Sequence, residues 1–264
     1  MKTRINKLTL LLLAVFAISC SNDSDNEAPE EITPSYLLTK LNSTSAFNTY
    51  TYNDADKLIE IDGADGSFTS TFNSTLTYNG SGKIQEELKI VSALFSTPSY
   101  NRIIYNYDAQ GRLTEKKYTQ NSSATPAVYD HKQSLIFEYN GSTVTQKLLI
   151  KGNALPSNKA VFEYDKRGNV SKITYYNKID ANTPEGVFFY SHTYTYDTKP
   201  NPESSLPLEY RFPNTSKNNP IKVIETYNSG SPTTADIVVE YNEGGYPTKK
   251  SQSGIVSTYE YKKL

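Results

Sequence analysis

Apolar and polar positions alternate along most of the chain. From residue 50 onward, short segments place an aromatic or aliphatic residue at positions i and i+2 and a polar residue between them. Successive strand residues point to opposite faces of a sheet, so each segment predicts a strand with one buried and one polar face. The residues between the apolar pair are Thr51, Thr77, Asn106, Glu138, Glu163, Thr195, Glu240 and Glu260. Sustained helical spacing is missing, so we expect few helices.

These segments belong to a repeat unit with eight copies. The unit has an apolar residue, any residue, Tyr, then Asn or Asp, two further residues, Gly, a basic residue or Asn, and an aliphatic residue. Residues 105–113 form its most complete copy. The tyrosines at its third position are Tyr52, Tyr78, Tyr107, Tyr139, Tyr164, Tyr196, Tyr241 and Tyr261. We expect these tyrosines to have a structural role.

The centre of the unit predicts a tight hairpin turn. Asp108 and Asp165 suit the first position of a type I turn, where the side chain bonds the backbone ahead. A glycine three residues later supplies the positive φ of a three-residue loop with a bulge. These glycines are Gly82, Gly111, Gly168 and Gly245. Asp56 takes this place in the first copy, and the shorter fourth copy predicts a type I′ turn at Asn140-Gly141.

Longer loops rich in Ser, Thr, Asn and Pro separate the hairpins, and the segment 199–219 is the least regular part of the repeat region. The chain is therefore predicted to be all-β, a long antiparallel meander of repeated hairpins. We expect a strongly curled sheet or a barrel, because closure hides the edge strands.

The N-terminus carries the features of an export signal. Lys2 and Arg4 precede an apolar run over residues 8–18, and Cys20 follows. This pattern predicts a signal peptide over residues 1–19. The run is too short to cross the roughly 30 Å hydrocarbon layer of a membrane.

Cys20 stands where the signal would be cut, and the site resembles a bacterial lipobox. The resemblance implies that Cys20 is lipid-modified and anchors the protein to a membrane. The alternative is a free buried cysteine after an ordinary cleavable signal.

An acidic, polar stretch follows the cysteine. Residues 20–35 are predicted to be a disordered tether, and residues 36–264 a single β domain. The start of the tether resembles the surface-export signal of Bacteroidota lipoproteins; a plain spacer is the alternative. The residues of this signal are Ser21, Asn22, Asp23, Ser24, Asp25, Asn26 and Glu27.

Composition narrows the chemistry. The chain has one cysteine, two histidines and a net charge of −1. Disulfide frameworks and cysteine-rich zinc modules are therefore excluded, and no basic excess indicates nucleic acid. His131 and His192 are expected to be solvated or packed rather than catalytic. With no nucleophile elbow, metalloprotease or nucleotide-binding motif, we expect a non-enzyme without cofactor or metal.

The repeat unit resembles the YD repeat of RHS-type proteins over most of residues 50–264. Together with the lipobox, the chain is similar to surface lipoproteins of Bacteroidota with YD-like tyrosine repeats. That resemblance implies a porin-like or curled-sheet fold and an outer-membrane location, and it carries over no catalytic residue. The RHS shell that encloses a toxin is not expected from eight copies.

Three functions fit these observations. The first is a non-catalytic binding or adhesion module for glycan or peptide, because aromatic faces beside polar groups suit sugars. Tyr100, Tyr129 and Tyr176 are the candidate ligand residues, since they are predicted to lie in loops. The second is a structural envelope lipoprotein whose tyrosines form only the core.

The third function is a membrane-spanning barrel. A three-residue loop would place Tyr50 opposite Glu60 and Tyr105 opposite Glu115. Charges on the aromatic face disfavour contact of that face with lipid, at a cost of up to about 2–4 kcal/mol each at the bilayer midplane.

Overall fold

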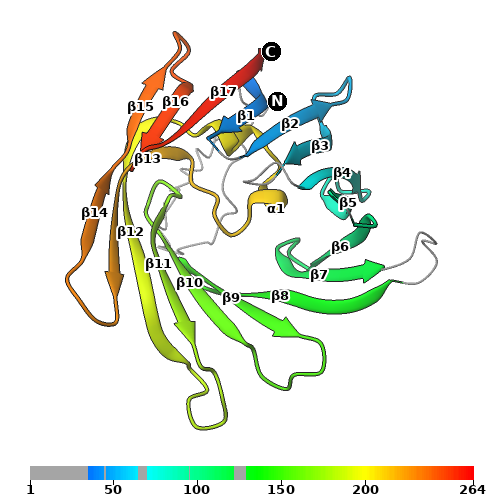
Figure 1. The fold of residues 1–264 in the computed structure, drawn as a ribbon, viewed down its shortest axis with the longest axis vertical. Helices are drawn as coiled ribbons and strands as arrows, with labels where there is room; N and C mark the ends of the chain where they lie inside the picture. The colour runs from blue at the N-terminus through cyan, green and yellow to red at the C-terminus, as the bar shows by residue number, and fades with distance from the viewer. Residues whose placement is uncertain (1–34, 45, 65–69, 95, 122–128) are drawn as a thin grey trace, which may run out of the picture. The chain divides into compact units, whose positions relative to one another are not determined.

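The structure, a computed structural model, describes residues 35–44, 46–64, 70–94, 96–121 and 129–264 (Figure 1). The predicted signal peptide, Cys20 and the export signal lie outside the described residues.

The described chain forms a 17-stranded antiparallel sheet with two short helical turns. The first strands are β1 (Tyr36–Ser43), β2 (Phe47–Tyr52), β3 (Leu58–Ala64), β4 (Ser70–Tyr78), β5 (Ile84–Ala93), β6 (Ser99–Tyr107), β7 (Leu113–Asn121), β8 (Asp130–Asn140) and β9 (Thr143–Ile150). The others are β10 (Asn158–Tyr164), β11 (Val170–Asn177), β12 (Val187–Pro200), β13 (Asn218–Tyr227), β14 (Thr233–Asp236), β15 (Val238–Tyr241), β16 (Pro247–Gln252) and β17 (Ile255–Lys263).

The sheet curls into a nearly closed barrel. Except for β14 and β15, each strand pairs with its neighbours in the chain, and β17 pairs with β1, so the ladder returns to its start. β14 pairs with β13, whereas β15 pairs with β16, and Ile237 alone separates the two strands in the chain. They therefore behave as two halves of one interrupted strand. The predicted all-β meander of hairpins is confirmed.

The turns place the strands one residue away from the predicted register. Tyr50 faces Ile61 and Tyr105 faces Lys116, so the predicted partners Glu60 and Glu115 are wrong. A bulge beside the repeated tyrosine takes up one residue, which turns both glutamates to the outer face. The same one-residue shift places Leu76 opposite Glu87 and Phe162 opposite Ile173.

The fourth turn also differs from the prediction. Asn140 pairs with Thr143, so the loop residues are Gly141 and Ser142. Gly141 alone has a positive φ, +57°, which is the geometry of a type II′ turn rather than the predicted type I′. Both turns match the twist of the strands, and a glycine at the first loop position favours type II′.

The other tight turns form as the sequence predicts. Asp108 Oδ1 accepts the N–H groups of Gln110 (3.0 Å) and Arg112 (2.8 Å), and Asp165 does the same two and four residues ahead. In these turns, positive φ values occur at the predicted positions, Asp56, Gly82, Gly111, Gly168 and Gly245.

The repeated tyrosines join neighbouring hairpins by hydrogen bonds. Tyr107 donates its hydroxyl to the carbonyl of Ile84 at 2.5 Å. The last pair of the β5–β6 ladder is Glu86–Ile104, so Ile84 lies beyond the ladder, and the tyrosine supplies the donor. The same bond recurs, from tyrosine to carbonyl, for Tyr52–Leu38, Tyr78–Leu58, Tyr139–Leu113, Tyr196–Val170 and Tyr261–Pro247. We call these the tyrosine–carbonyl bonds.

The basic residue that follows the glycine position of one copy packs over the tyrosine ring of the next copy. Lys57 Nζ lies 3.7 Å from the ring centroid of Tyr78, and the Arg112 guanidinium lies 4.7 Å from that of Tyr139. Such cation–π contacts contribute about 0.5–1 kcal/mol at exposed sites. The cation–π contact with the tyrosine of the adjacent copy thus explains the preference for Lys or Arg after the glycine.

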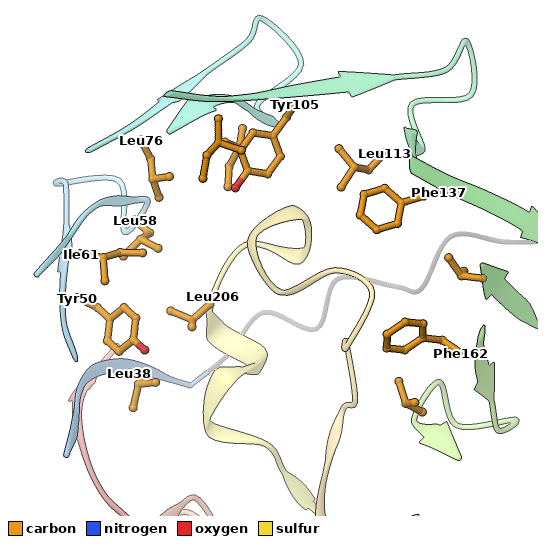
Figure 2. Close-up of a cluster of buried hydrophobic side chains, with 14 of the residues drawn as sticks. Leu38, Tyr50, Leu58, Ile61, Leu76, Tyr105, Leu113, Phe137, Phe162 and Leu206 are labelled. Atoms are coloured by element: carbon orange, nitrogen blue, oxygen red, sulfur yellow. The ribbon is translucent and has the colours of Figure 1, made fainter. Parts of the chain in front are cut away.

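The apolar face of the sheet forms the core inside the barrel. Figure 2 shows side chains from successive strands directed toward Leu206, which comes from a segment that enters the barrel. The labelled residues are Leu38, Tyr50, Leu58, Ile61, Leu76, Tyr105, Leu113, Phe137, Phe162 and Leu206. Apolar burial inside the ring is thus the main stabilising contribution.

The outer wall is polar. Of the eight residues between the apolar pair of the unit, seven are exposed and Glu163 is half-buried. Ion pairs cross neighbouring strands on this wall, as in Glu138–Lys147 at 2.6 Å and Glu240–Lys249 at 2.9 Å. Within the described ranges, no helix is long and apolar enough to cross a membrane.

The tyrosine–carbonyl bonds predict a specific stability loss. Replacing Tyr107 by Phe leaves the Ile84 carbonyl without its donor, so we expect the free energy of unfolding in urea to fall by about 1–3 kcal/mol. Tyr100→Phe, on the outer face of the same strand, is the control and should change it by no more than about 0.5 kcal/mol. Equal losses in the two variants would contradict this role.

Alkaline pH should unfold the barrel cooperatively. Burial raises the pKa of Tyr52, Tyr139 and Tyr196 to about 12, whereas an unfolded tyrosine titrates near about 10. Below the unfolded pKa both states are neutral and the stabilisation is complete. As pH rises from about 10 to 12, only the unfolded state loses protons, so stability falls. Tyrosinate absorbance should therefore rise together with loss of the β-sheet circular dichroism signal. Titration of these tyrosines near pH 10 with the sheet intact would contradict the prediction.

Candidate functional site

Residues 201–217, here the inward segment, replace the tight turn of the sixth repeat copy. Asp197 Oδ1 accepts the N–H of Lys199 at 3.0 Å, as in other copies, but its second donor is the N–H of Asn219, also at 3.0 Å. Between them the chain enters the barrel through η1 (Pro202–Ser205) and α1 (Leu208–Arg211) (Figure 1). The segment is thus an insertion into a turn that otherwise keeps its hydrogen-bond pattern.

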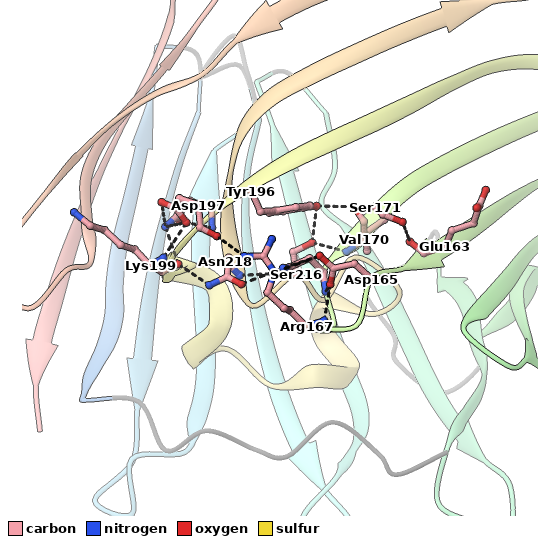
Figure 3. A network of polar contacts seen from close by, with 12 residues as sticks. Glu163, Asp165, Arg167, Val170, Ser171, Tyr196, Asp197, Lys199, Ser216 and Asn218 are labelled. Carbon is pink, nitrogen blue, oxygen red and sulfur yellow. Dashed lines mark hydrogen bonds and ion pairs between the residues drawn. The ribbon is translucent and has the colours of Figure 1, made fainter. Parts of the chain in front are cut away.

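The base of the inward segment is fixed to the neighbouring hairpin (Figure 3). Ser216 Oγ accepts the N–H of Val170 at 3.1 Å and lies 2.8 Å from the Tyr196 hydroxyl. Asn169 and Asn218 exchange hydrogen bonds of 2.9 and 3.0 Å. These bonds hold the C-terminal end of the insertion, and the N–H of Asn201 donates to the Lys217 carbonyl at 2.8 Å, which joins the other end to it.

A buried lysine fixes the tip of the segment from the opposite wall. Lys116 Nζ on β7 donates to the carbonyls of Tyr210 (3.2 Å) and Phe212 (3.0 Å), at the end of α1. Burial lowers the pKa of Lys116 to about 8, an effect that the nearby Glu87 opposes. Glu87 itself accepts hydrogen bonds from Ser74 at 2.8 Å and from Tyr105 at 3.1 Å. Each buried charge thus has hydrogen-bond partners, acceptors for Lys116 and donors for Glu87, which offset the cost of burial.

On the side of β12, β13, β16 and β17, the segment leaves space. A cavity of about 280 Å³ adjoins a second of about 330 Å³, and both are lined by Glu203, Lys250, Gln252 and Tyr259. The first also contacts His192, Tyr194 and Glu225. The second reaches the β16–β17 turn at Ser253. The interior is therefore asymmetric, with a packed core against one half of the barrel and a polar, aromatic-lined cavity against the other.

Some cavity side chains form a hydrogen-bonded group. Glu225 Oε1 lies 3.3 Å from His192 Nε2, and His192 Nδ1 lies 3.2 Å from the Tyr194 hydroxyl. Lys250 Nζ makes no hydrogen bond to a described residue; burial lowers its pKa, which Glu203 partly offsets. Burial also raises the pKa of Tyr259. The cavity thus offers aromatic faces, two carboxylates and an available ammonium.

No group of three or more His, Cys, Asp or Glu side chains suited to a metal ion occurs in the part of the chain that the structure describes.

The candidate ligand tyrosines lie elsewhere. Tyr100 is in β6 and Tyr176 is in β11, so the prediction that they are loop residues is wrong. Each lies three residues from a buried isoleucine of its strand, and alternation turns it to the outer wall. Tyr129 precedes β8, with its ring centroid 5.9 Å from the Arg102 guanidinium. None of the three lines the cavity.

The sequence alone does not distinguish the tyrosines of the cavity from those of the core. Tyr194 and Tyr259 occupy the first position of the repeat unit, as do the buried Tyr50 and Tyr105. The irregular stretch 199–219 is the sequence feature that could have indicated the cavity, because it predicts an insertion between two strands. The alternation of the strands does not predict that this insertion enters the barrel.

Comparison with known proteins identifies the class of fold. No family model and no curated protein matches the sequence. The structure is similar to a porin-like protein from Bacteroides vulgatus ATCC 8482, with TM-score 0.51, 12% identity, and coverage of 87% of this chain and 100% of that one. A porin-like protein from Bacteroides uniformis ATCC 8492 matches with TM-score 0.38 and 11% identity over 87% of this chain and 98% of that one. The first likeness establishes a fold of the porin-like β-barrel class.

The Lys116 contact predicts how firmly the inward segment is held. Lys116→Met removes the donor to two carbonyls at the end of α1, so we expect the free energy of unfolding to fall by about 1–3 kcal/mol. Proteolysis of the native protein should then begin within residues 201–217. Lys147→Met removes an outer-wall ion pair and should cost no more than about 1 kcal/mol, without new cleavage. An unchanged cleavage pattern in Lys116→Met would contradict the anchor.

Proposed function

We propose that this protein is an exported, non-catalytic carbohydrate-binding barrel, anchored to the outer membrane by lipid on Cys20. The observation that carries the proposal is the cavity inside an otherwise packed barrel. A barrel that served only as a scaffold would gain stability by filling this space with apolar side chains, as it does on the side of β2–β11.

The chemistry of the lining favours sugars. Aromatic rings stack on the C–H faces of pyranoses, and neighbouring polar groups orient the hydroxyls. Tyr194 and Tyr259 offer rings, while Glu203, Lys250 and Gln252 offer acceptors and donors. A peptide is less well suited, because extended peptides commonly add to a free sheet edge, and the ladder here returns from β17 to β1.

The outer wall supports a water-exposed barrel rather than a membrane-spanning one. Ion pairs such as Glu138–Lys147 and Lys40–Glu260 stand on that wall. A basic residue facing lipid at the bilayer midplane costs about 2–4 kcal/mol. Attachment through Cys20 places the barrel at the membrane without that cost. The porin-like name of the similar structure from Bacteroides vulgatus supports an envelope location.

The contacts of Glu225 suit a binding role. Its Oε1 lies 3.3 Å from His192 Nε2, and its Oε2 accepts the Tyr227 hydroxyl at 3.1 Å. These contacts orient the carboxylate in the cavity lining, and each oxygen keeps a lone pair that can accept a hydrogen bond from a ligand hydroxyl.

A binding experiment tests the proposal. The purified protein should give saturable hits on a glycan array and no hits on a matched peptide panel. Tyr259→Ala should weaken the interaction at least about tenfold by calorimetry, since one stacked ring contributes about 0.5–1.5 kcal/mol beyond its buried area. Tyr176→Ala, on the outer wall, is the control and should leave the affinity unchanged. A folded protein that binds no glycan, or that binds peptides instead, would overturn the proposal.

A further inference from the structure

A stripe of aromatic side chains runs along the inner face of β12. Tyr190, His192, Tyr194 and Tyr196 occupy alternate positions, and their successive ring centroids are 5.2, 6.0 and 6.2 Å apart. Alternate strand residues advance by about 6.7 Å, so the stripe covers about 20 Å of the wall. Its inner part, from His192 to Tyr196, lines the cavity, while Tyr190 lies beyond it.

The outer end of the stripe is an aromatic cluster from three strands. Tyr190 stacks on Tyr175 of β11, with centroids 4.3 Å apart and planes 22° apart, and lies 5.9 Å from Tyr227 of β13. Figure 1 shows that the β11–β12 and β13–β14 hairpins, which carry these residues, project further than the strands on the far side of the barrel. Tyr227 is 45% exposed. Tyr227 is therefore the exposed member of the cluster, and Tyr175 and Tyr190 are half-buried behind it.

Hydrogen bonds connect this rim cluster to the cavity. Tyr227 donates to Glu225, Glu225 contacts His192, and His192 contacts Tyr194. None of these contacts is a tyrosine–carbonyl bond, so this part of the stripe does not join hairpins as the repeated tyrosines do. The path thus combines aromatic rings with hydrogen-bonding groups, which is what a chain of sugar rings would need.

We propose that the ligand is a linear oligosaccharide, bound along this stripe from the rim cluster of Tyr175, Tyr190 and Tyr227 into the cavity. This inference rests on the proposed carbohydrate-binding function and adds the shape of the ligand and a second subsite. A single sugar would cover one ring, whereas a chain covers several in series. The affinity should therefore increase with chain length until the stripe is covered.

Calorimetry with oligosaccharides of defined length tests the inference. The probes are the mono-, di-, tetra- and hexasaccharides of β-1,4-glucose, α-1,4-glucose, β-1,4-mannose, β-1,4-xylose and β-1,4-N-acetylglucosamine. In at least one series, we expect the Kd of the hexasaccharide to lie about tenfold or more below that of the disaccharide, since each added ring contact contributes.

Two rim variants locate the second subsite. Tyr190→Ala and, at the more exposed position, Tyr227→Ala should abolish most of the gain with length and leave the Kd of the disaccharide within about twofold. Tyr176→Ala is the control, because Tyr176 is an aromatic residue of β11 that alternation turns to the outer wall, opposite to the neighbouring Tyr175. Near-ultraviolet circular dichroism shows whether each variant is folded.

The outcomes separate the two proposals. If disaccharides bind and longer chains bind no better in the unmodified protein, the linear-ligand inference is wrong and the binding function stands. The inference is also wrong if the rim variants weaken the disaccharide and the hexasaccharide equally. If no sugar of any length binds to the folded protein, the proposed function fails together with the inference.

Discussion

The barrel depends on a hydrogen bond from a repeated tyrosine to a backbone carbonyl of the preceding hairpin. Each three-residue turn has a bulge beside the tyrosine, and the ladder between neighbouring hairpins stops two residues short of the aliphatic residue that follows the turn. The carbonyl of that residue would be buried without a donor, at a cost of about 1–3 kcal/mol. The tyrosine hydroxyl supplies the donor while its ring fills the space between hairpins. Tyrosine thus supplies both the hydrogen-bond donor for the carbonyl and the apolar surface that packs between the hairpins.

The exceptions to this bond lie beside the inward segment. Tyr164 follows the shortened fourth turn and donates to the carbonyl of Pro213, within the segment. Tyr241 follows the interrupted sixth turn and donates to the Asp197 carboxylate. Where the repeat loses its regular carbonyl, the tyrosine therefore fixes the insertion or its base. The segment in turn packs against one half of the wall, and the unfilled other half becomes the cavity.

The sequence predicted the all-β class, the meander and the turn chemistry, because these follow from local alternation and from Asn, Asp and Gly at fixed offsets. It missed the register by one residue, since a bulge at the tyrosine is a three-dimensional property of the loop. It also missed the cavity. Tyr105 in the core and Tyr259 in the cavity stand at the same position of the unit, and only the path of residues 201–217 decides which of them is covered.

The proposed function implies a barrel that buries its apolar face inside and meets water outside. Spin-label accessibility on the full-length protein in membranes measures this directly, with a single label at Thr75 on the outer face or at Leu76 on the inner face. We expect a polar relaxation agent to reach the label at Thr75 freely and the label at Leu76 hardly at all. A label at Thr75 that oxygen reaches from the lipid phase, while the polar agent is excluded, would show instead that the outer wall faces lipid.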